Sequence, residues 1–133
     1  MQFYGTVLYV DDVPRVKDFY QRAFGLPTRF YDEALQFAEL ETGTALLAIA
    51  SHPLGEMLMP GQYRRPEGGQ PSGVEVAFIT SDVRASFTKA IEAGATALAE
   101  PKVMPWGATV AYVRSIEGTL IGFSTPVGGK PQS

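Results

Sequence analysis

The chain repeats one pattern of predicted elements twice. Residues 5–12 and 73–82 are short apolar runs, and each ends in Asp followed by Val. A helical pattern follows each run, because apolar residues recur three and four positions apart and so share one face. Each helical pattern ends at a glycine. The predicted N-caps are Asp12 and Asp82, and the predicted C-caps are Gly25 and Gly94. Such a repeat restricts the chain to two copies of one small module.

Three strand-like runs follow each predicted helix, separated by turn residues. They span residues 28–31, 35–40 and 44–50 in the first half, and 95–100, 109–113 and 119–124 in the second. The sequence therefore predicts an α+β fold of two βαβββ modules, residues 1–51 and 73–127. We expect a curved mixed sheet that forms a cup for a small molecule, with the helices outside.

The remaining segments lack a regular period. Residues 52–72 are rich in Pro, Gly and Met and are predicted to form a linker and lid. Residues 128–133 are predicted to be a flexible tail. The charged pair Arg64 and Arg65 in the linker is interpreted as solvated loop charge.

Composition excludes several classes of protein. Of the 133 residues, 45% are hydrophobic and 19% are charged, which is typical of a soluble globular protein. The net charge is −3 and the basic residues are scattered, so no nucleic-acid partner is expected. With no cysteine, the chain has no disulfide, thiolate zinc site or cysteine nucleophile. No apolar run is long enough to span a membrane, and no signal peptide is recognised, so we expect a cytoplasmic protein without a membrane partner.

Several motifs carry a resemblance to a known family over nearly the whole chain. They are Leu8-Tyr-Val-Asp-Asp-Val13, Phe19-Tyr20 before Phe24-Gly25-Leu26, Ile91-Glu-Ala-Gly-Ala95, Pro105-Trp106-Gly107, and Ala111-Tyr-Val-Arg114 followed by Glu117-Gly118. In this order they resemble the vicinal oxygen chelate superfamily, which contains glyoxalases, bleomycin-resistance proteins and extradiol dioxygenases. The resemblance concerns the fold, because this fold hosts many chemistries.

The resemblance implies a divalent metal held by His, Gln or Glu from four strands. The matching positions here are Gly5, Leu47 or Ala48, Glu75 and Gly122. Only Glu75 has a ligating side chain, whereas such a site needs three or four protein ligands. The single histidine, His52, is interpreted as a surface or rim residue. We therefore predict no metal and no cofactor, and the chain resembles the metal-free branch, whose bleomycin-type members bind a drug without altering it.

Strand alternation and the family resemblance together predict a ligand-binding surface with an aromatic and thioether lining. Its predicted members are Phe37, Leu47, Ile49, Met57, Met59, Tyr63, Glu75, Trp106 and Tyr112. Phe37 and Tyr112 are interpreted as equivalent positions of the two halves, and a role in the core remains the alternative for both. Trp106 is expected in a loop at the mouth of the cup.

Glu75 is the predicted polar group of this surface. It would accept a hydrogen bond from a ligand N–H, pair with a cationic ligand, or act as a general base. The alternative is a Glu75 side chain that faces solvent or Arg114.

These features favour a binding protein with no catalytic residue. We predict that it sequesters a bulky aromatic natural product, such as a peptide antibiotic. One alternative is a glyoxalase-like lyase or isomerase, or a dioxygenase, that acts on a small substrate; another is a module that binds a protein. The resemblance also implies a homodimer, in which the halves are either exchanged between chains or paired within one.

Overall fold

The computed structural model describes residues 1–66 and 69–126. The chain divides into two compact units, Met1–Arg65 and Pro66–Ser133, each of which holds one module. We call them unit 1 and unit 2. The predicted tail at residues 128–133 lies outside the described residues. Among the described helices, none has the length and apolar character needed to cross a membrane.

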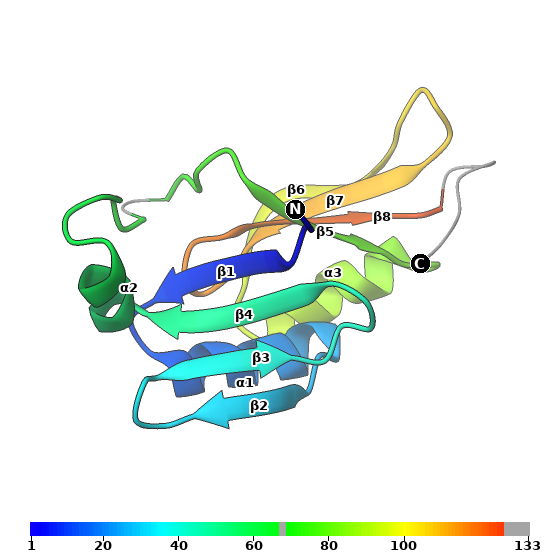
Figure 1. Cartoon of the computed structure of the whole chain (residues 1–133). Coiled ribbons are helices and arrows are strands. Elements are labelled where there is room, and N and C mark those ends of the chain that lie inside the picture. The colour runs from blue at the N-terminus through cyan, green and yellow to red at the C-terminus, as the bar shows by residue number, and fades with distance from the viewer. Residues whose placement is uncertain (67–68, 127–133) are drawn as a thin grey trace. The chain divides into compact units, whose positions relative to one another are not determined.

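Unit 1 is a mixed four-stranded sheet with one long helix and one short one. Its elements are β1 (Gly5–Val10), α1 (Val13–Phe24), β2 (Thr28–Asp32), β3 (Phe37–Leu40), β4 (Leu46–Ser51) and α2 (His52–Leu58). The strands lie in the order β1-β4-β3-β2, as Figure 1 shows, and only β1 and β4 are parallel. Helix α1 packs on β3 and β4.

Helix α1 begins and ends as its sequence predicts. The Asp12 side chain accepts a hydrogen bond from the Arg15 backbone N–H at 3.1 Å, which satisfies one unpaired donor of the first turn. Gly25 adopts a left-handed conformation with φ of 71° at the C-cap, where a side chain would be strained. The apolar face of α1 is buried against the sheet and includes Phe19 and Tyr20, whose rings meet edge to face.

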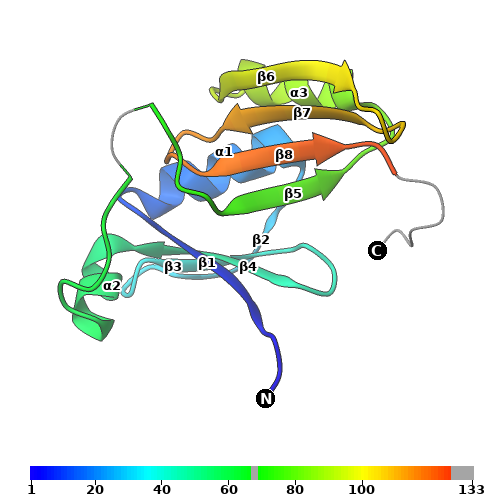
Figure 2. The same ribbon diagram turned by 90° about the horizontal axis from the view of Figure 1, so that it is seen from above.

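Unit 2 repeats the arrangement. Its elements are β5 (Glu75–Ile79), α3 (Val83–Glu92), β6 (Thr96–Val103), β7 (Thr109–Arg114) and β8 (Leu120–Ser124). The strand order is β5-β8-β7-β6, and α3 lies along one face of this sheet (Figure 2). Asp82 caps α3 by accepting from the Ala85 N–H at 3.0 Å. The C-cap is Ala93 and not Gly94, which follows it with φ of 120°, so the predicted cap was wrong by one residue.

Each sheet has a face covered by its long helix and a face turned away from it, which we call the open face. In unit 1 the helix-covered pairs are Ala38 with Ile49 and Leu40 with Leu47, all buried. Tyr112 and Gly122 pair on the open face of unit 2, whereas the flanking Ala111 and Val113 are buried under α3. The alternation of side chains along each strand therefore separates core from open face.

The predicted fold class is confirmed as an α+β fold with two βαβββ modules, each forming a mixed four-stranded sheet. The single cup and the homodimer stay predictions. Helix α2 was not expected, because residues 52–58 contain a proline and a glycine and carry little apolar periodicity. It forms because Ser51 caps it, accepting from the Leu54 N–H at 3.2 Å, and because Pro53 occupies its first turn, where no N–H is needed.

Candidate functional site

The open face of unit 2 brings together Glu75, Tyr112 and Gly122. These residues come from β5, β7 and β8, and pairing of the strands places them on one face. A Cβ atom built at Gly122 would overlap Glu75 Oε2 and would come 3.0 Å from Tyr112 Cε1. The carboxylate of Glu75 therefore fills the space above Gly122, beside the Tyr112 ring. The structure thus gathers two of the predicted ligand-binding residues.

Glu75 has an exposed side chain and makes no hydrogen bond or ion pair with any residue that the structure describes. The proposed alternative partner, Arg114, lies on the same face but pairs with Leu120, which separates it from β5. Two strand spacings put the Cα atoms of Glu75 and Arg114 about 10 Å apart. The Glu75 carboxylate is therefore available to a ligand.

The four positions that the family resemblance matched to metal ligands do not fit a metal. A Cβ atom at Gly5 would overlap the backbone oxygen of Leu46, so a ligating side chain cannot stand there without a shift of the backbone. On β4 it is Ala48 that shares the open face with Val7, and alanine has no donor atom. Among residues 1–66 and 69–126, no group of three His, Cys, Asp or Glu side chains is placed to hold an ion. One carboxylate, Glu75, is too small a donor set.

The two modules are not equivalent at the aromatic position. Tyr112 pairs with Gly122, and Glu39 pairs with Ala48, which is the counterpart of Gly122 in unit 1. The counterpart of Tyr112 is therefore Glu39, and the predicted equivalence with Phe37 was wrong by two residues. Phe37 still lies on the open face, because a slip of two residues preserves the face.

Leu47 and Ile49 lie on the face that α1 covers. Their exposed fractions are 6% and 0%, and their strand partners Leu40 and Ala38 are fully buried. In unit 1 these two predicted ligand-binding residues therefore contribute to the core.

Trp106 lies in the tight turn between β6 and β7, where its side chain is 63% exposed. Strand pairing places Glu75 level with Leu120 and Arg114, at the end of β7 that is remote from this turn. Unit 2 therefore does not place Trp106 beside the Glu75 carboxylate.

The other predicted ligand-binding residues lie in and after α2 of unit 1. Met57 is 65% exposed and lines a pocket, and Met59 is the C-cap residue of α2. The Tyr63 ring packs against Tyr9 of the open face with the centroids 5.3 Å apart, and stacks on His52 at 5.7 Å. Tyr63 is thus held against the end of β1.

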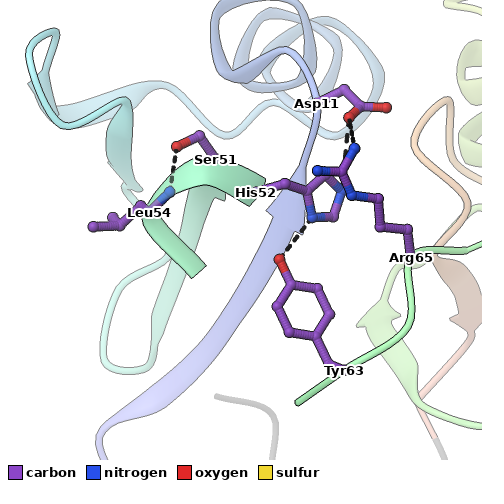
Figure 3. Close-up of polar contacts among 6 residues, drawn as sticks. All are labelled: Asp11, Ser51, His52, Leu54, Tyr63 and Arg65. Atoms are coloured by element: carbon purple, nitrogen blue, oxygen red, sulfur yellow. Dashed lines mark hydrogen bonds and ion pairs between the residues drawn. The ribbon is translucent and has the colours of Figure 1, made fainter. Parts of the chain in front are cut away.

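A polar cluster made of Asp11, His52, Tyr63 and Arg65 joins the end of β1 to the chain that follows α2 (Figure 3). The Tyr63 hydroxyl lies 2.7 Å from His52 Nδ1, and Arg65 Nη1 lies 3.1 Å from Asp11 Oδ1. His52 Nε2 is 4.0 Å from the same Asp11 oxygen. The cluster fixes the chain up to Arg65 on unit 1.

Burial shifts the pKa values of two groups in this cluster, His52 and Tyr63. The pKa of His52 is lowered, first by burial and then by the Arg65 charge, while Asp11 acts in the opposite direction. Burial raises the pKa of the Tyr63 hydroxyl. Burial therefore favours the neutral imidazole, and His52 Nδ1 shares a hydrogen bond with the neutral Tyr63 hydroxyl.

The sequence reasoning missed this cluster. His52 is 3% exposed and is not a surface or rim residue, and Arg65 is paired and not only solvated. The local signal was weak, because the four residues come from three separate segments. The Ser-His-Pro run at residues 51–53, which can cap and begin a helix, was the available signal that His52 is fixed in place.

Comparison with known proteins identifies the family. The family model described as Glyoxalase/Bleomycin resistance protein/Dioxygenase superfamily matches residues 4–126. The chain belongs to this superfamily. A comparison with curated proteins found no match.

Solved structures of the superfamily share the fold. A glyoxalase/bleomycin resistance protein/dioxygenase family enzyme from Burkholderia phytofirmans PsJN is 20% identical with a TM-score of 0.78, over 94% of this chain and 98% of that one. A glyoxalase-related enzyme from Fulvimarina pelagi is 18% identical with a TM-score of 0.78, over 99% and 96%. TioX from Micromonospora sp. ML1 is 24% identical with a TM-score of 0.70, over 94% and 98%. At these identities the likeness concerns the fold alone.

Proposed function

We propose that this superfamily member binds a bulky aromatic natural product, such as a peptide antibiotic, and sequesters it without chemical change. The observation that carries the proposal is the open face of unit 2, where the Glu75 carboxylate lies beside the Tyr112 ring above Gly122 and has no hydrogen-bond or ion-pair partner within residues 1–66 and 69–126. An aromatic ligand would stack on Tyr112, and a ligand N–H would donate to Glu75.

The donor set supports binding over metal-dependent catalysis. Superfamily enzymes that use a metal need several ligands, whereas Gly5 is closed by the Leu46 backbone and Gly122 by the Glu75 carboxylate. Glu75 is the only remaining ligand of the four positions. A reaction routed through a tightly held ion is therefore a poor match to these residues.

The proposal is tested by calorimetric titration with a panel of bleomycin-like and intercalator-like antibiotics, followed by mass spectrometry of the recovered compound. We expect saturable binding of at least one compound and its recovery intact. Chemical conversion of a bound compound would contradict sequestration and favour an enzyme.

Two variants locate the site. Tyr112→Ala should weaken binding by about tenfold, the loss expected for one stacked aromatic contact and its buried area. Tyr4→Ala is the matched control, because Tyr4 is 72% exposed and belongs to unit 1. Equal affinities of the two variants would remove Tyr112 from the site.

Trp106 is tested separately, because unit 2 does not place it beside Tyr112. Trp106→Ala should weaken binding at least tenfold if the turn between β6 and β7 reaches the bulky ligand. Quenching of Trp106 fluorescence, the only tryptophan signal, reports the same contact. Unchanged affinity and fluorescence would remove Trp106 from the ligand surface while leaving the Tyr112 test intact.

A further inference from the structure

Unit 1 contains a pocket that is lined only by its own residues. Its volume is about 300 Å³, which is at the lower end of the range for small-molecule sites. It lies where the turn between β2 and β3 meets the ends of β1 and β4 and the first turns of α2. The lining residues are Asp11, Ala34, Leu35, Gln36, Ser51, Pro53, Leu54 and Met57.

The walls of this pocket are apolar. Leu54 and Met57 come from α2, and Leu35 comes from the turn before β3. Leu35 and Met57 are 50% and 65% exposed, so the mouth of the pocket presents apolar side chains to a ligand. The pocket thus combines an apolar surface with a few polar groups.

The polar groups of the pocket accept hydrogen bonds. Gln36 Nε2 donates both of its protons, to the Tyr31 hydroxyl at 2.9 Å and to the Glu33 carbonyl oxygen at 2.8 Å. Its amide oxygen is then the only group that the Gln36 side chain can offer a ligand. The Ser51 hydroxyl oxygen already accepts from the Leu54 N–H.

Asp11 adds a carboxylate to the lining of the same pocket, and Arg65 balances its charge through the ion pair at Oδ1. Arg65 and His52 both approach its Oδ1, and its Oδ2 has no partner among residues 1–66 and 69–126 (Figure 3). The polar cluster holds this carboxylate at the end of β1. The unused acceptors, Asp11 Oδ2 and the Gln36 amide oxygen, favour a ligand that supplies hydrogen-bond donors, and charged N–H donors make the stronger bonds to a carboxylate.

We propose that this pocket binds a small organic amine whose ammonium group donates to Asp11 and to the Gln36 amide oxygen. Its apolar body contacts Leu35, Leu54 and Met57. This site goes beyond the proposed function, since it belongs to unit 1 and uses none of Glu75, Tyr112 or Trp106.

The test is an NMR titration of the ¹⁵N-labelled full chain with 2-phenylethylamine. 2-Phenylethanol serves as the neutral probe and 3-phenylpropionate as the anionic probe. We expect saturable shifts from the amine at the amides of residues 34–36 and 51–57, with at least tenfold weaker binding of the alcohol and none of the acid. Equal binding of amine and alcohol, or shifts confined to other residues, would overturn the proposal.

Charge variants at the exposed Ala34 keep the test independent of folding. Ala34→Lys places an ammonium at the mouth of the pocket and should abolish amine binding, whereas Ala34→Glu should strengthen it. Asp11→Asn should weaken binding at least tenfold, and Asp18→Asn, on the exposed side of α1, should change it less than twofold. If Ala34→Lys and Ala34→Glu bind the amine equally, the charge argument is wrong, whatever the antibiotic titration of unit 2 shows.

Discussion

Removal of one hydroxyl, in the variant Tyr63→Phe, tests the polar cluster that holds the chain after α2. The hydroxyl lies 2.7 Å from Nδ1 of His52, whose exposed fraction is 3%. Its loss leaves a buried imidazole nitrogen without a partner, and an unsatisfied buried polar group costs about 1–3 kcal/mol. The ring contact with Tyr9 at 5.3 Å remains, so little packing is lost.

We take about 1–2 kcal/mol as the expected loss in the free energy of unfolding, because Tyr63 is only half-buried and water can partly replace its hydroxyl. That loss corresponds to a shift of about 5- to 30-fold in the ratio of folded to unfolded chain.

The assay must report on unit 1. Trp106 belongs to unit 2, so its fluorescence is unsuitable, and far-UV circular dichroism in urea should be combined with hydrogen exchange at α2. The measurement is made at pH 8, where His52 is neutral. Tyr4→Phe is the matched control, because Tyr4 is 72% exposed. A Tyr63→Phe variant as stable and as well protected at α2 as Tyr4→Phe would refute the reasoning.

Three further predictions concern stability. The pKa of His52 is lowered in the folded chain, so the unfolded chain takes up the proton first as the pH falls. The contribution of His52 to the free energy of unfolding should therefore be full above pH 6.5 and should fall below it, by at most about 1.4 kcal/mol per pH unit. Urea denaturation of His52→Gln should show a flatter dependence of stability on pH. Gly5→Ala should destabilise the fold by about 1–3 kcal/mol, because the added Cβ atom would overlap the β4 backbone. Gly73→Ala is the control, because a Cβ atom there meets open space, and thermal unfolding of both variants measures the difference. Phe19→Ala should lose about 3–5 kcal/mol in urea, because the side chain is fully buried, and a loss no larger than that of the exposed Phe3→Ala would contradict the assigned core.

The fold could be read from the sequence because its signals are local and repeated. The capping residues Asp12, Asp82 and Gly25 act within a few residues of themselves, so their positions in the chain reveal their roles. Alternation along β1 likewise separates Val10, which is buried in the core, from Gly5 and Tyr9 on the open face.

The candidate site was harder to predict because it depends on register and on distant contacts. Alternation has a period of two, so it cannot detect the slip of two residues that separates Phe37 from Glu39. Leu47 and Ala48 are both apolar, and only the pairing with β1 shows which of them shares the open face. The position of the Glu75 carboxylate above Gly122 depends on the pairing of β5 with β8, which the sequence alone does not reveal.

The polar cluster of Asp11, His52, Tyr63 and Arg65 also depends on contacts between distant parts of the chain, which the sequence does not reveal. Asp11 and Arg65 lie far apart in the chain, and each is a charged residue of the kind that usually lies on the solvated surface. Their ion pair at 3.1 Å depends on helix α2, which turns the chain back toward the end of β1. A helix that depends on one cap and one proline gives little periodic signal.

We propose that this superfamily member binds its ligand without a bound metal. This proposal is tested most directly by elemental analysis of the full chain, purified without chelators and normalised to protein concentration. The account predicts that Zn, Ni, Fe and Mn together stay far below one ion per chain. One tightly held ion per chain would contradict the account and favour a metal-dependent enzyme.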